Sequence, residues 1–316
     1  MKKTIAAIVL SYNDPRVFAL INCLAGQRLQ FDEIIVVDDG SDDIDLDAVR
    51  VAISQFANVT YHFKKSNKGV NDSIKFALSI VQSEYFYLLS SGDEYVDDLL
   101  SEFKRVEDDF HPGIIAAGIK TYRAGQPSQT REYKTNFPTG YLFYGEELSN
   151  VLAHSPNVFF GGGCFIKTSL ARNITHNFER LSWASDFFIY YFCAITDGVV
   201  FIDAVLMTQV LEDGQYSNSG KVIERANVSL EFIDVVSALN NSAKQEFKSA
   251  AILPNYSLMT LVKLCLSKKS RWYLSFRLLS KFTLHVLGYL FSRFVPFSLQ
   301  RKVRGLLRCL DNRIKC

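Results

Sequence analysis

The sequence predicts an α/β fold, an open, mostly parallel β-sheet with helices on both faces, followed by a helical, basic and amphipathic C-terminal extension. Three observations favour it. Short apolar runs alternate with amphipathic helical segments through roughly the first hundred residues, and such alternation specifies parallel strands joined by right-handed crossovers. The apolar run at residues 34–37 shows no polar alternation, as expected for a strand that is buried on both faces. Several of the expected strands also end in polar side chains.

The chain opens with an expected strand at residues 4–10. This start resembles a signal peptide, but its apolar run is short and breaks into a polar segment without a cleavage-like site, so we interpret it as a strand. A helix follows, with Asn13 or Asp14 as its cap, Pro15 in its first turn and Gly26 at its end.

The next elements continue the alternation. We expect strands at residues 34–37, 59–63 and 85–89, and a helix at residues 46–56. A further helix follows the segment Asn67-Lys-Gly-Val-Asn-Asp-Ser73. Its apolar residues recur at the spacing of one helix face: Ile74, Ala77, Leu78 and Val81.

Polar pairs stand at the ends of three of these strands: Tyr12/Asn13, Asp38/Asp39 and Asp93/Glu94. The carboxyl ends of parallel strands meet at one edge of a sheet, which is where open α/β sheets bind their ligands. A polar turn explains any one pair equally well, since Asp-Gly is a common turn sequence. Three pairs at the same edge predict a binding site.

The pattern loosens after Phe110. We expect strands at residues 114–122, 157–166 and 199–204, a helix at residues 187–195 and a polar loop at residues 211–220. The run Phe160-Gly-Gly-Gly-Cys-Phe165 indicates a close-packed backbone passage. It lacks the G-x-G-x-x-G spacing, which argues against a dinucleotide-binding fingerprint.

The composition is globular, and the formal net charge of +2 hides an asymmetry. From Lys263 onward, thirteen basic residues accompany a single acid, Asp311, so the preceding part carries a formal charge of −10. The six cysteines form no C-x-x-C pair, which favours reduced thiols in a cytosolic setting. No apolar stretch reaches the roughly 20 residues that a membrane-spanning helix requires.

The C-terminal region, residues 221–316, is expected to be helical and two-faced. Arg277, Lys281 and His285 recur at four-residue spacing opposite an apolar stripe, and a second apolar stripe with basic neighbours follows Pro296. Such helices suit the surface of a membrane that contains anionic lipid. Two alternatives stay open: a core-packing helix with a solvated basic face, and a nucleic-acid contact, which the acidic remainder of the chain disfavours.

Six segments occur in an order and spacing that are specific together, although each is weak alone. They are Val9-Leu-Ser-Tyr-Asn13, Ile35-Val-Val-Asp-Asp-Gly-Ser41, Asn67-Lys-Gly69, Leu88-Leu-Ser-Ser-Gly-Asp93, Gly161-Gly-Gly-Cys-Phe-Ile-Lys167 and Ser185-Asp186. In these segments the chain resembles the family 2 glycosyltransferases of GT-A fold, of the type that builds bacterial cell-surface polysaccharides. The resemblance covers roughly residues 3–220 and implies a transferase domain over residues 1–220.

The resemblance implies a nucleotide-sugar donor, with uridine or thymidine as the favoured base. Asp39 would accept a hydrogen bond from a ring N–H of the base. Tyr12 would stack on the base, although an aromatic residue here can also simply close the sheet edge. The implied donor site comprises Ser11, Tyr12, Asn13, Asp39, Asn67, Gly69 and Ser90.

The diphosphate leaving group needs a divalent cation or a basic clamp to take up its developing charge. The resemblance implies Mg²⁺ or Mn²⁺ with Asp93 as a ligand, since both ions prefer oxygen. The chain departs from the family here, because Ser90 and Gly92 occupy the D-x-D positions. Glu212 or Asp213 stands where the family often has a metal-binding histidine, and a solvated loop acid is the alternative.

Asp186 is the implied catalytic base, which would take the proton of the acceptor hydroxyl. It can also cap the helix that follows, and the two roles are compatible. Ser185 stands where the family has a glutamate. Gly162, Gly163 and Trp183 are the implied acceptor-side residues, and Trp183 either stacks on a sugar or only packs.

We therefore predict an inverting, metal-assisted glycosyltransferase that uses a nucleoside diphosphate sugar. Its acceptor would be a saccharide or a lipid-linked saccharide, reached by a cytoplasmic protein that is peripheral on the inner face of the cell membrane. A catalytically degenerate homologue that binds a nucleotide or a partner is the alternative, because Ser90 and Gly92 are not carboxylates. A sugar-nucleotide-forming transferase is disfavoured, since residues 11–16 lack its Gly-rich basic loop.

Overall fold

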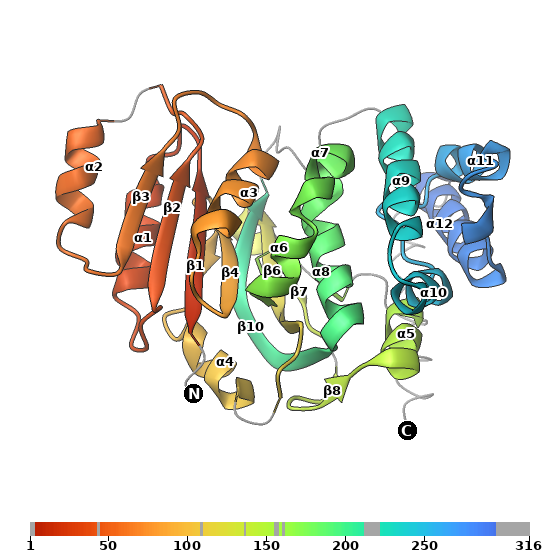
Figure 1. Cartoon of the computed structure of the whole chain (residues 1–316), viewed down its shortest axis with the longest axis horizontal. Coiled ribbons are helices and arrows are strands. Elements are labelled where there is room, and N and C mark those ends of the chain that lie inside the picture. Colours follow the sequence, from red (N-terminus) through yellow and green to blue (C-terminus); the bar gives the residue numbers. More distant parts are fainter. Residues whose placement is uncertain are drawn as a thin grey trace.

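The structure, a computed structural model, describes residues 4–42, 45–107, 110–135, 137–154, 158–159, 162–211 and 222–294. Figure 1 shows a twisted central sheet with helices on both faces and a group of C-terminal helices at one end of the molecule. This architecture confirms the predicted α/β fold, including its helical C-terminal region.

The sheet contains ten strands within the described residues. Eight of them form the path β3-β2-β1-β4-β9-β6-β10-β5, while β7 pairs with β6 and β8 pairs with β10. The strands are β1 (Ile5–Ser11), β2 (Glu33–Asp38), β3 (Val59–Phe63), β4 (Tyr85–Ser90), β5 (Glu94–Tyr95), β6 (Ile114–Arg123), β7 (Arg131–Tyr133), β8 (Leu142–Phe143), β9 (Cys164–Lys167) and β10 (Val199–Leu211). The first four strands are mutually parallel, and β9 runs antiparallel between β4 and β6.

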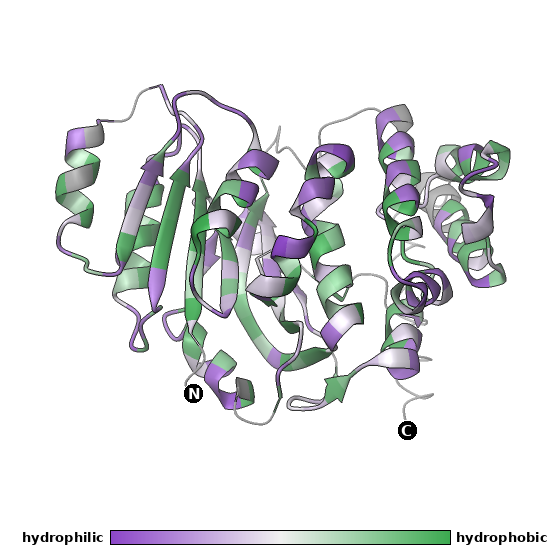
Figure 2. Cartoon of the chain, in the orientation of Figure 1, coloured by the Kyte–Doolittle hydropathy of each residue, from purple (hydrophilic) through white to green (hydrophobic). Residues whose placement is uncertain are grey.

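Two buried clusters, one on each face, hold the helices to this sheet. On β1 the side chains of Ala6 and Ile8 belong to one cluster, and those of Ile5, Ala7 and Val9 belong to the other. Figure 2 shows the hydrophobic colour of these central strands. Because successive side chains of a strand point to opposite faces, both faces must be covered, which explains the unbroken apolar runs in the sequence.

The helices before the C-terminal region connect these strands. They are α1 (Val17–Ala25), α2 (Leu46–Ile53), α3 (Val70–Ile80), α4 (Leu99–Glu107), α5 (Gly145–His154), α6 (Thr168–Asn173), α7 (Phe178–Leu181) and α8 (Ser185–Asp197), with 3₁₀ turns at Pro127–Gln129, Thr175–Asn177 and Ser182–Ala184. Buried residues of α3 and α8 join the first cluster, and those of α1 and α4 join the second.

Several local predictions differ from the structure, and the helix predicted at residues 46–56 ends at Ile53. Arg16, not Asn13 or Asp14, is the N-cap of α1: Asn13 has a φ of 48° and accepts from Asp42, and Asp14 lies two residues before the cap, where its Oδ1 accepts from the Arg16 N–H at 3.0 Å. Of the strand predicted at residues 157–166, the described residues 158–159 and 162–163 are not strand, and β9 spans Cys164–Lys167. Strand β10 runs to Leu211 instead of ending at residue 204, because it pairs with β6 throughout and passes two register shifts between Ile202 and Met207.

The C-terminal region contains α9 (Val222–Ser237), α10 (Asn241–Ser249), α11 (Leu258–Leu266) and α12 (Phe276–Phe294), with a 3₁₀ turn at Arg271–Tyr273. Phe232, Phe247 and Leu278 belong to the same buried cluster as Phe188 of α8. The predicted division between residues 220 and 221, like the stripe after Pro296, lies outside the described residues.

The basic face predicted for α12 is wrong for two of its three residues. Arg277 donates to the carbonyl of Ser249 at 2.9 Å, and Lys281 donates to three backbone carbonyls, so both side chains face the protein. Apolar residues are exposed instead, Phe276, Leu279, Leu284 and Leu287 on α12 and Leu258, Met259, Val262 and Leu266 on α11. An amphipathic stripe alone does not show which face of a helix packs against the protein. Here the carbonyls near the ends of neighbouring helices accept hydrogen bonds from Arg277 and Lys281, which turns these two side chains inward.

Across the described part of the chain, we find no helix with the length and apolar character needed to span a bilayer.

Lys281 gives a prediction about stability against pH. Its ammonium donates to the carbonyls of Leu152, Ala250 and Ala251 at 3.3, 2.8 and 3.3 Å. Burial, helped by the nearby Arg277, lowers the pKa of Lys281 from 10.5 to about 8. The unfolded chain therefore binds this proton at a higher pH than the folded chain does. The free energy of unfolding consequently decreases as the pH falls from 10.5 towards 8, by at most roughly 3 kcal/mol.

We expect the free energy of unfolding of the wild type, minus that of Lys281→Met, to rise between pH 8 and pH 10 in urea denaturation. Lys269→Met, which removes an exposed ammonium, is the matched control and should show no such rise. A flat difference for Lys281→Met would contradict the lowered pKa.

Candidate functional site

The carboxyl ends of β1 to β4 lie in one row at one edge of the sheet. Ser11 of β1 pairs with Asp38 of β2, and Asp38 pairs with Phe63 of β3. On the other side of β1, Leu10 pairs with Ser90 of β4. Because neighbouring strands lie about 4.8 Å apart, the predicted donor residues that follow these strands occupy one continuous edge.

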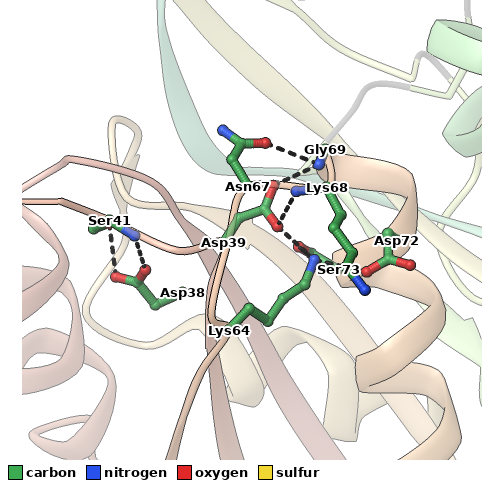
Figure 3. A network of polar contacts seen from close by, with 9 residues as sticks. All are labelled: Asp38, Asp39, Ser41, Lys64, Asn67, Lys68, Gly69, Asp72 and Ser73. Atoms are coloured by element: carbon green, nitrogen blue, oxygen red, sulfur yellow. Dashed lines mark hydrogen bonds and ion pairs between the residues drawn. The ribbon is translucent and has the colours of Figure 1, made fainter.

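Asp39 is the centre of a polar network at this edge (Figure 3). Its Oδ1 accepts hydrogen bonds from the Lys64 ammonium and from the N–H of Lys68 at 3.0 Å, and its Oδ2 accepts from the N–H of Gly69 at 2.7 Å. Burial raises the pKa of Asp39, but these donors outweigh it and hold the pKa below its ordinary value. A carboxylate oxygen accepts two hydrogen bonds, so one acceptor position remains on Oδ2 beyond these contacts.

Lys64 fixes the segment from β3 to α3 around that carboxylate. Its ammonium also pairs with Asp72 at 2.7 Å and donates to Ser73 Oγ at 3.1 Å. Burial lowers the pKa of Lys64, but its bonds to the two carboxylates outweigh this and raise the pKa above its ordinary value. Asn67 Oδ1 accepts from the same Gly69 N–H at 3.0 Å, so the predicted Asn67 and Gly69 both belong to the network.

Asp38 is a buried structural residue. Its Oδ1 accepts from the N–H of Ser41 at 2.7 Å, and its Oδ2 accepts from Ser41 Oγ at 2.9 Å and from the Tyr61 hydroxyl at 2.6 Å. Ser41 Oγ accepts from the N–H of Asn13 at 2.7 Å, and Asn13 Oδ1 accepts from the N–H of Asp42 at 2.9 Å. Asp38 therefore shapes the loops after β1 and β2, and its carboxylate is occupied by these three donors.

Ser11 and Tyr12 stand directly beside Asp39, whose N–H donates to the carbonyl of Ser11 at 2.9 Å. Ser11 Oγ is buried and has no hydrogen-bond partner among the described residues. A buried hydroxyl without a partner is costly, so this one suits a ligand polar group. The Tyr12 side chain is 45 % exposed, which leaves its ring available for stacking on a planar group.

Asp93 stands just after β4. Its Oδ1 accepts from the N–H of Val210 at 3.1 Å, because β10 runs on to Leu211 and reaches this edge. Its own N–H donates to the carbonyl of Ser90 at 3.2 Å. The next acid, Glu94, accepts from the Tyr122 hydroxyl at 2.6 Å.

The residues at the end of β4 do not form a preformed metal centre. Ser90 and Gly92 supply no carboxylate, and no three His, Cys, Asp or Glu side chains converge anywhere in the described ranges. The Arg16 guanidinium also lies over Gly92, with Nη2 3.1 Å from the position that a Cβ there would take. A fixed positive charge at this place opposes a cation, and Asp93 alone would need the phosphates of a bound donor as further ligands.

Gly162 connects β4 to α8. Its carbonyl accepts from the Tyr87 hydroxyl of β4, and its N–H lies against the Tyr190 hydroxyl of α8. We call this arrangement, Gly162 held between Tyr87 and Tyr190, the Gly162 clamp. Burial raises the pKa of Tyr87, and the charge of Asp93 adds to this rise, so Asp93 lies near the Gly162 clamp. The neighbouring Gly163 is buried, and its carbonyl accepts from the N–H of Ala117 in β6 at 2.9 Å.

Asn71 ties the donor edge to the start of α8. Its side-chain amide donates to the carbonyls of Phe178 and Ser182 at 3.1 and 2.8 Å. Asn71 lies two positions after Gly69, whose N–H donates to Asp39. The turn that Asn71 holds leads directly into Trp183 and Asp186. Trp183 Nε1 is buried without a hydrogen-bond partner among the described residues, as Ser11 Oγ is.

Asp186 lies in the first turn of α8 and is not its cap, since α8 begins at Ser185 and Ala184 occupies the N-cap position. Its Oδ1 accepts from the N–H of Phe187 at 2.7 Å. Burial raises the pKa of Asp186 despite this bond and one from its own N–H. A carboxylate with a raised pKa is a stronger base, which suits proton abstraction.

The sequence patterns did not single out Lys64, the Asn71 link or the tyrosines of the Gly162 clamp. Lys64 follows a strand end at the same edge, a position that the strand-end rule could have found. The others depend on contacts between residues far apart in the chain, which no local pattern shows. The predicted residues Gly161, Glu212 and Asp213 lie outside the described part of the structure.

Gly40 allows the close approach on which the Asp39 network depends. Its φ is +79°, and a Cβ there would lie 2.5 Å from the carbonyl carbon of Ser66 and 2.7 Å from the nitrogen of Asn67. Gly125 is a matched control, because it has a φ of +77° and nothing within 4 Å of the same position.

We expect Gly40→Ala to lower the free energy of unfolding by roughly 3 kcal/mol or more, since backbone strain and a clash with backbone atoms add up. Gly125→Ala should cost only about 1 kcal/mol, for the φ alone. Urea denaturation of both variants measures the difference. Equal losses would mean that residues 66–67 move aside freely.

The sequence profile of Glycosyl transferase family 2 matches residues 6–175, and a search of curated proteins gave no match.

Solved structures with a similar fold include S. aureus TarS 1–349 in complex with UDP, with a TM-score of 0.60 and 15 % identity over 95 % of this chain and 77 % of that one. The same fragment with UDP-GlcNAc gives a TM-score of 0.59 at 15 % identity, over 94 % and 77 % of the two chains. The mannosyltransferase PcManGT from Pyrobaculum calidifontis, in complex with GDP-Man and Mn²⁺, gives a TM-score of 0.52 at 15 % identity over 98 % and 81 %. At these identities the similarity shows a shared fold.

The family match spans more than half of the chain, and the fold and the strand-end segments agree with it. The chain therefore belongs to glycosyl transferase family 2 and is a glycosyltransferase.

Proposed function

We propose that this glycosyltransferase moves a sugar from a nucleoside diphosphate sugar, with a UDP-sugar favoured, to a saccharide or lipid-linked saccharide in cell-surface polysaccharide synthesis. The observation that carries the donor class is the remaining acceptor position on Asp39 Oδ2. It lies next to Ser11, whose Oγ has no hydrogen-bond partner within the described ranges. A uracil ring offers the N–H that such an acceptor binds. The similar solved structures are complexes of those proteins with UDP, with UDP-GlcNAc and with GDP-Man.

In this proposal Tyr12 stacks on the base, Asp39 accepts its ring N–H, and Ser11 and Asn13 bond the ribose. Asn13 Oδ1 already accepts from Asp42, so its amide N–H groups remain to donate to the ligand. Asn67 and Gly69 act by holding Asp39, and Ser90 lies at the end of β4, where the donor's phosphates follow.

Transfer then proceeds by one displacement. The acceptor hydroxyl attacks the anomeric carbon, Asp186 takes its proton, and the bond to the diphosphate oxygen breaks with its electron pair on the leaving group. Attack from the face opposite the diphosphate inverts the anomeric centre. Trp183, whose indole N–H has no partner in the part of the chain that the structure describes, and Gly162 border the acceptor in this arrangement.

The predicted Mg²⁺ or Mn²⁺ enters no step of this mechanism, because no three His, Cys, Asp or Glu side chains converge on a metal site within the described ranges. Asp93 is the residue that would contact a cation arriving with the phosphates of the donor, and donor binding itself is proposed not to need one.

Asp186→Asn tests the catalytic step. We expect the variant to lose transfer or donor hydrolysis by roughly 10²–10⁴-fold, since the amide cannot accept the proton, while its affinity for UDP stays within about twofold. In the wild type, activity should fall as the pH drops through the raised pKa of Asp186, because protonation abolishes the base.

The control is Asp203→Asn, which removes an exposed carboxylate on β10. Full activity in Asp186→Asn would exclude Asp186 as the base. A wild type that binds UDP but turns over no sugar would support the second candidate, a nucleotide-binding homologue without catalysis, which Ser90 and Gly92 favour.

We also propose that α11 and α12 contact a membrane, where a lipid-linked acceptor would lie. These neighbouring helices expose eight large apolar side chains. Residues 247–294 contain no Asp or Glu. The exposed basic residues Lys268, Lys269 and Arg271 lie in the segment between the two helices. Apolar burial together with attraction to anionic headgroups is how amphipathic helices bind a bilayer surface. A second copy of the same basic surface would be repelled, which favours a lipid partner over self-association.

Vesicle co-sedimentation tests this contact. We expect the protein to bind vesicles that contain phosphatidylglycerol, and the double variant Leu266→Glu, Leu287→Glu to bind at least about tenfold more weakly, since it places charge on exposed leucines. Val51→Glu is the control, because Val51 is 73 % exposed on α2 at the other end of the molecule (Figure 1). Vesicle binding equal to wild type in the double variant would contradict the proposal, and so would a wild type that dimerises and binds no vesicles.

A further inference from the structure

The Arg16 guanidinium occupies the place at the end of β4 where the family carries a carboxylate. Its Nη2, Cζ and Nη1 lie 3.1, 3.4 and 3.5 Å from the position that a Cβ on Gly92 would take. A side chain at residue 92 would therefore be in tight contact with the guanidinium, and one of the two would have to shift by a few tenths of an ångström.

Arg16 is held in this place by Asp14. Oδ1 of Asp14 accepts from Nε at 2.8 Å and Oδ2 accepts from Nη2 at 2.9 Å, a two-point contact along one edge of the guanidinium. Asp14 itself is anchored to the other side of the site, because Ser91 Oγ donates to its Oδ2 at 2.8 Å. Burial raises the pKa of Asp14, but these bonds outweigh it and hold the pKa below its ordinary value, so the pair stays ionised.

The position of this pair relates it to the donor. Arg16 follows the loop after β1, which carries Ser11 and Tyr12, and Gly92 follows β4, the neighbour of β1 in the sheet. A nucleotide whose base lies on Tyr12 and Asp39 extends its phosphates along this edge. Its leaving group gains one negative charge when the bond to the sugar breaks, and a positive group must stabilise that charge.

We propose that Arg16 binds the diphosphate of the donor and stabilises the leaving group, in place of a carboxylate-bound metal ion, so that donor binding is largely independent of divalent cations. The inference rests on the proposed function. A guanidinium binds phosphate oxygens through charge-assisted, often bidentate hydrogen bonds, and it stays protonated throughout. The electron pair of the broken bond goes to the diphosphate oxygen, and the acceptor proton goes to Asp186.

Titration calorimetry tests the proposal with the tightest binder among UDP, dTDP and GDP, and with the matching nucleoside. In the wild type, we expect the affinity for the diphosphate to change by less than about threefold between Mn²⁺ and EDTA. Arg16→Gln should weaken diphosphate binding by roughly tenfold or more and leave nucleoside binding unchanged, because only the phosphates contact Arg16. Arg28→Gln, which removes another exposed arginine, is the control and should change neither.

The double variant Arg16→Gln, Gly92→Asp supplies the reverse experiment. It replaces the guanidinium with a carboxylate at the family's position, so we expect its diphosphate affinity to recover at least about tenfold on addition of Mn²⁺. The inference is overturned if the wild type requires Mn²⁺ for the diphosphate, or if Arg16→Gln weakens nucleoside and diphosphate equally, as a merely structural role would. Failure of every nucleotide to bind the wild type would refute the proposed function itself.

Discussion

The site depends on how the Asp39 carboxylate is held. Its position after β2 is fixed by three donors that come from one continuous segment, the Lys64 ammonium and the N–H groups of Lys68 and Gly69. These bonds satisfy a buried charge, and they fold the segment between β3 and α3 over the sheet edge. Without them, an unpaired carboxylate would stand at the place where the donor's base is proposed to bind.

Much of the frame could be predicted from sequence because it depends on local patterns. The strand at residues 59–63 and the helix that begins near Val70 follow from apolar periodicity, and the shared strand edge follows from strand–helix alternation. The side-chain network could not be predicted, because Tyr87 meets Gly162 across 75 positions and Asn71 meets Ser182 across 111. The sequence also did not show that Lys281 faces the protein, because the amphipathic pattern of α12 is compatible with either face of the helix packing inward.

Basic side chains play two different roles in this molecule. Lys281 and Arg277 donate hydrogen bonds to helix carbonyls in the C-terminal region, so the basic residues there do not all form a basic surface. Arg16 is compensated by Asp14 and yet keeps its guanidinium at the sheet edge, where it is half exposed. The same residue type therefore supports packing in one region and is proposed to bind an anion in the other. Only the contacts of each side chain separate the two cases.

The start of α3 is bonded both to Asp39 and to the turn before α8, and this has a consequence for the size of the donor that can react. Gly69 bonds Asp39, and Asn71, two residues later, bonds the turn that leads into Asp186. One short piece of helix thus spaces the base-recognising carboxylate from the proton acceptor. If both act as proposed, the backbone at the start of α3 fixes the spacing between the bound base and the reacting carbon, so transfer would depend on the length of the link that joins them.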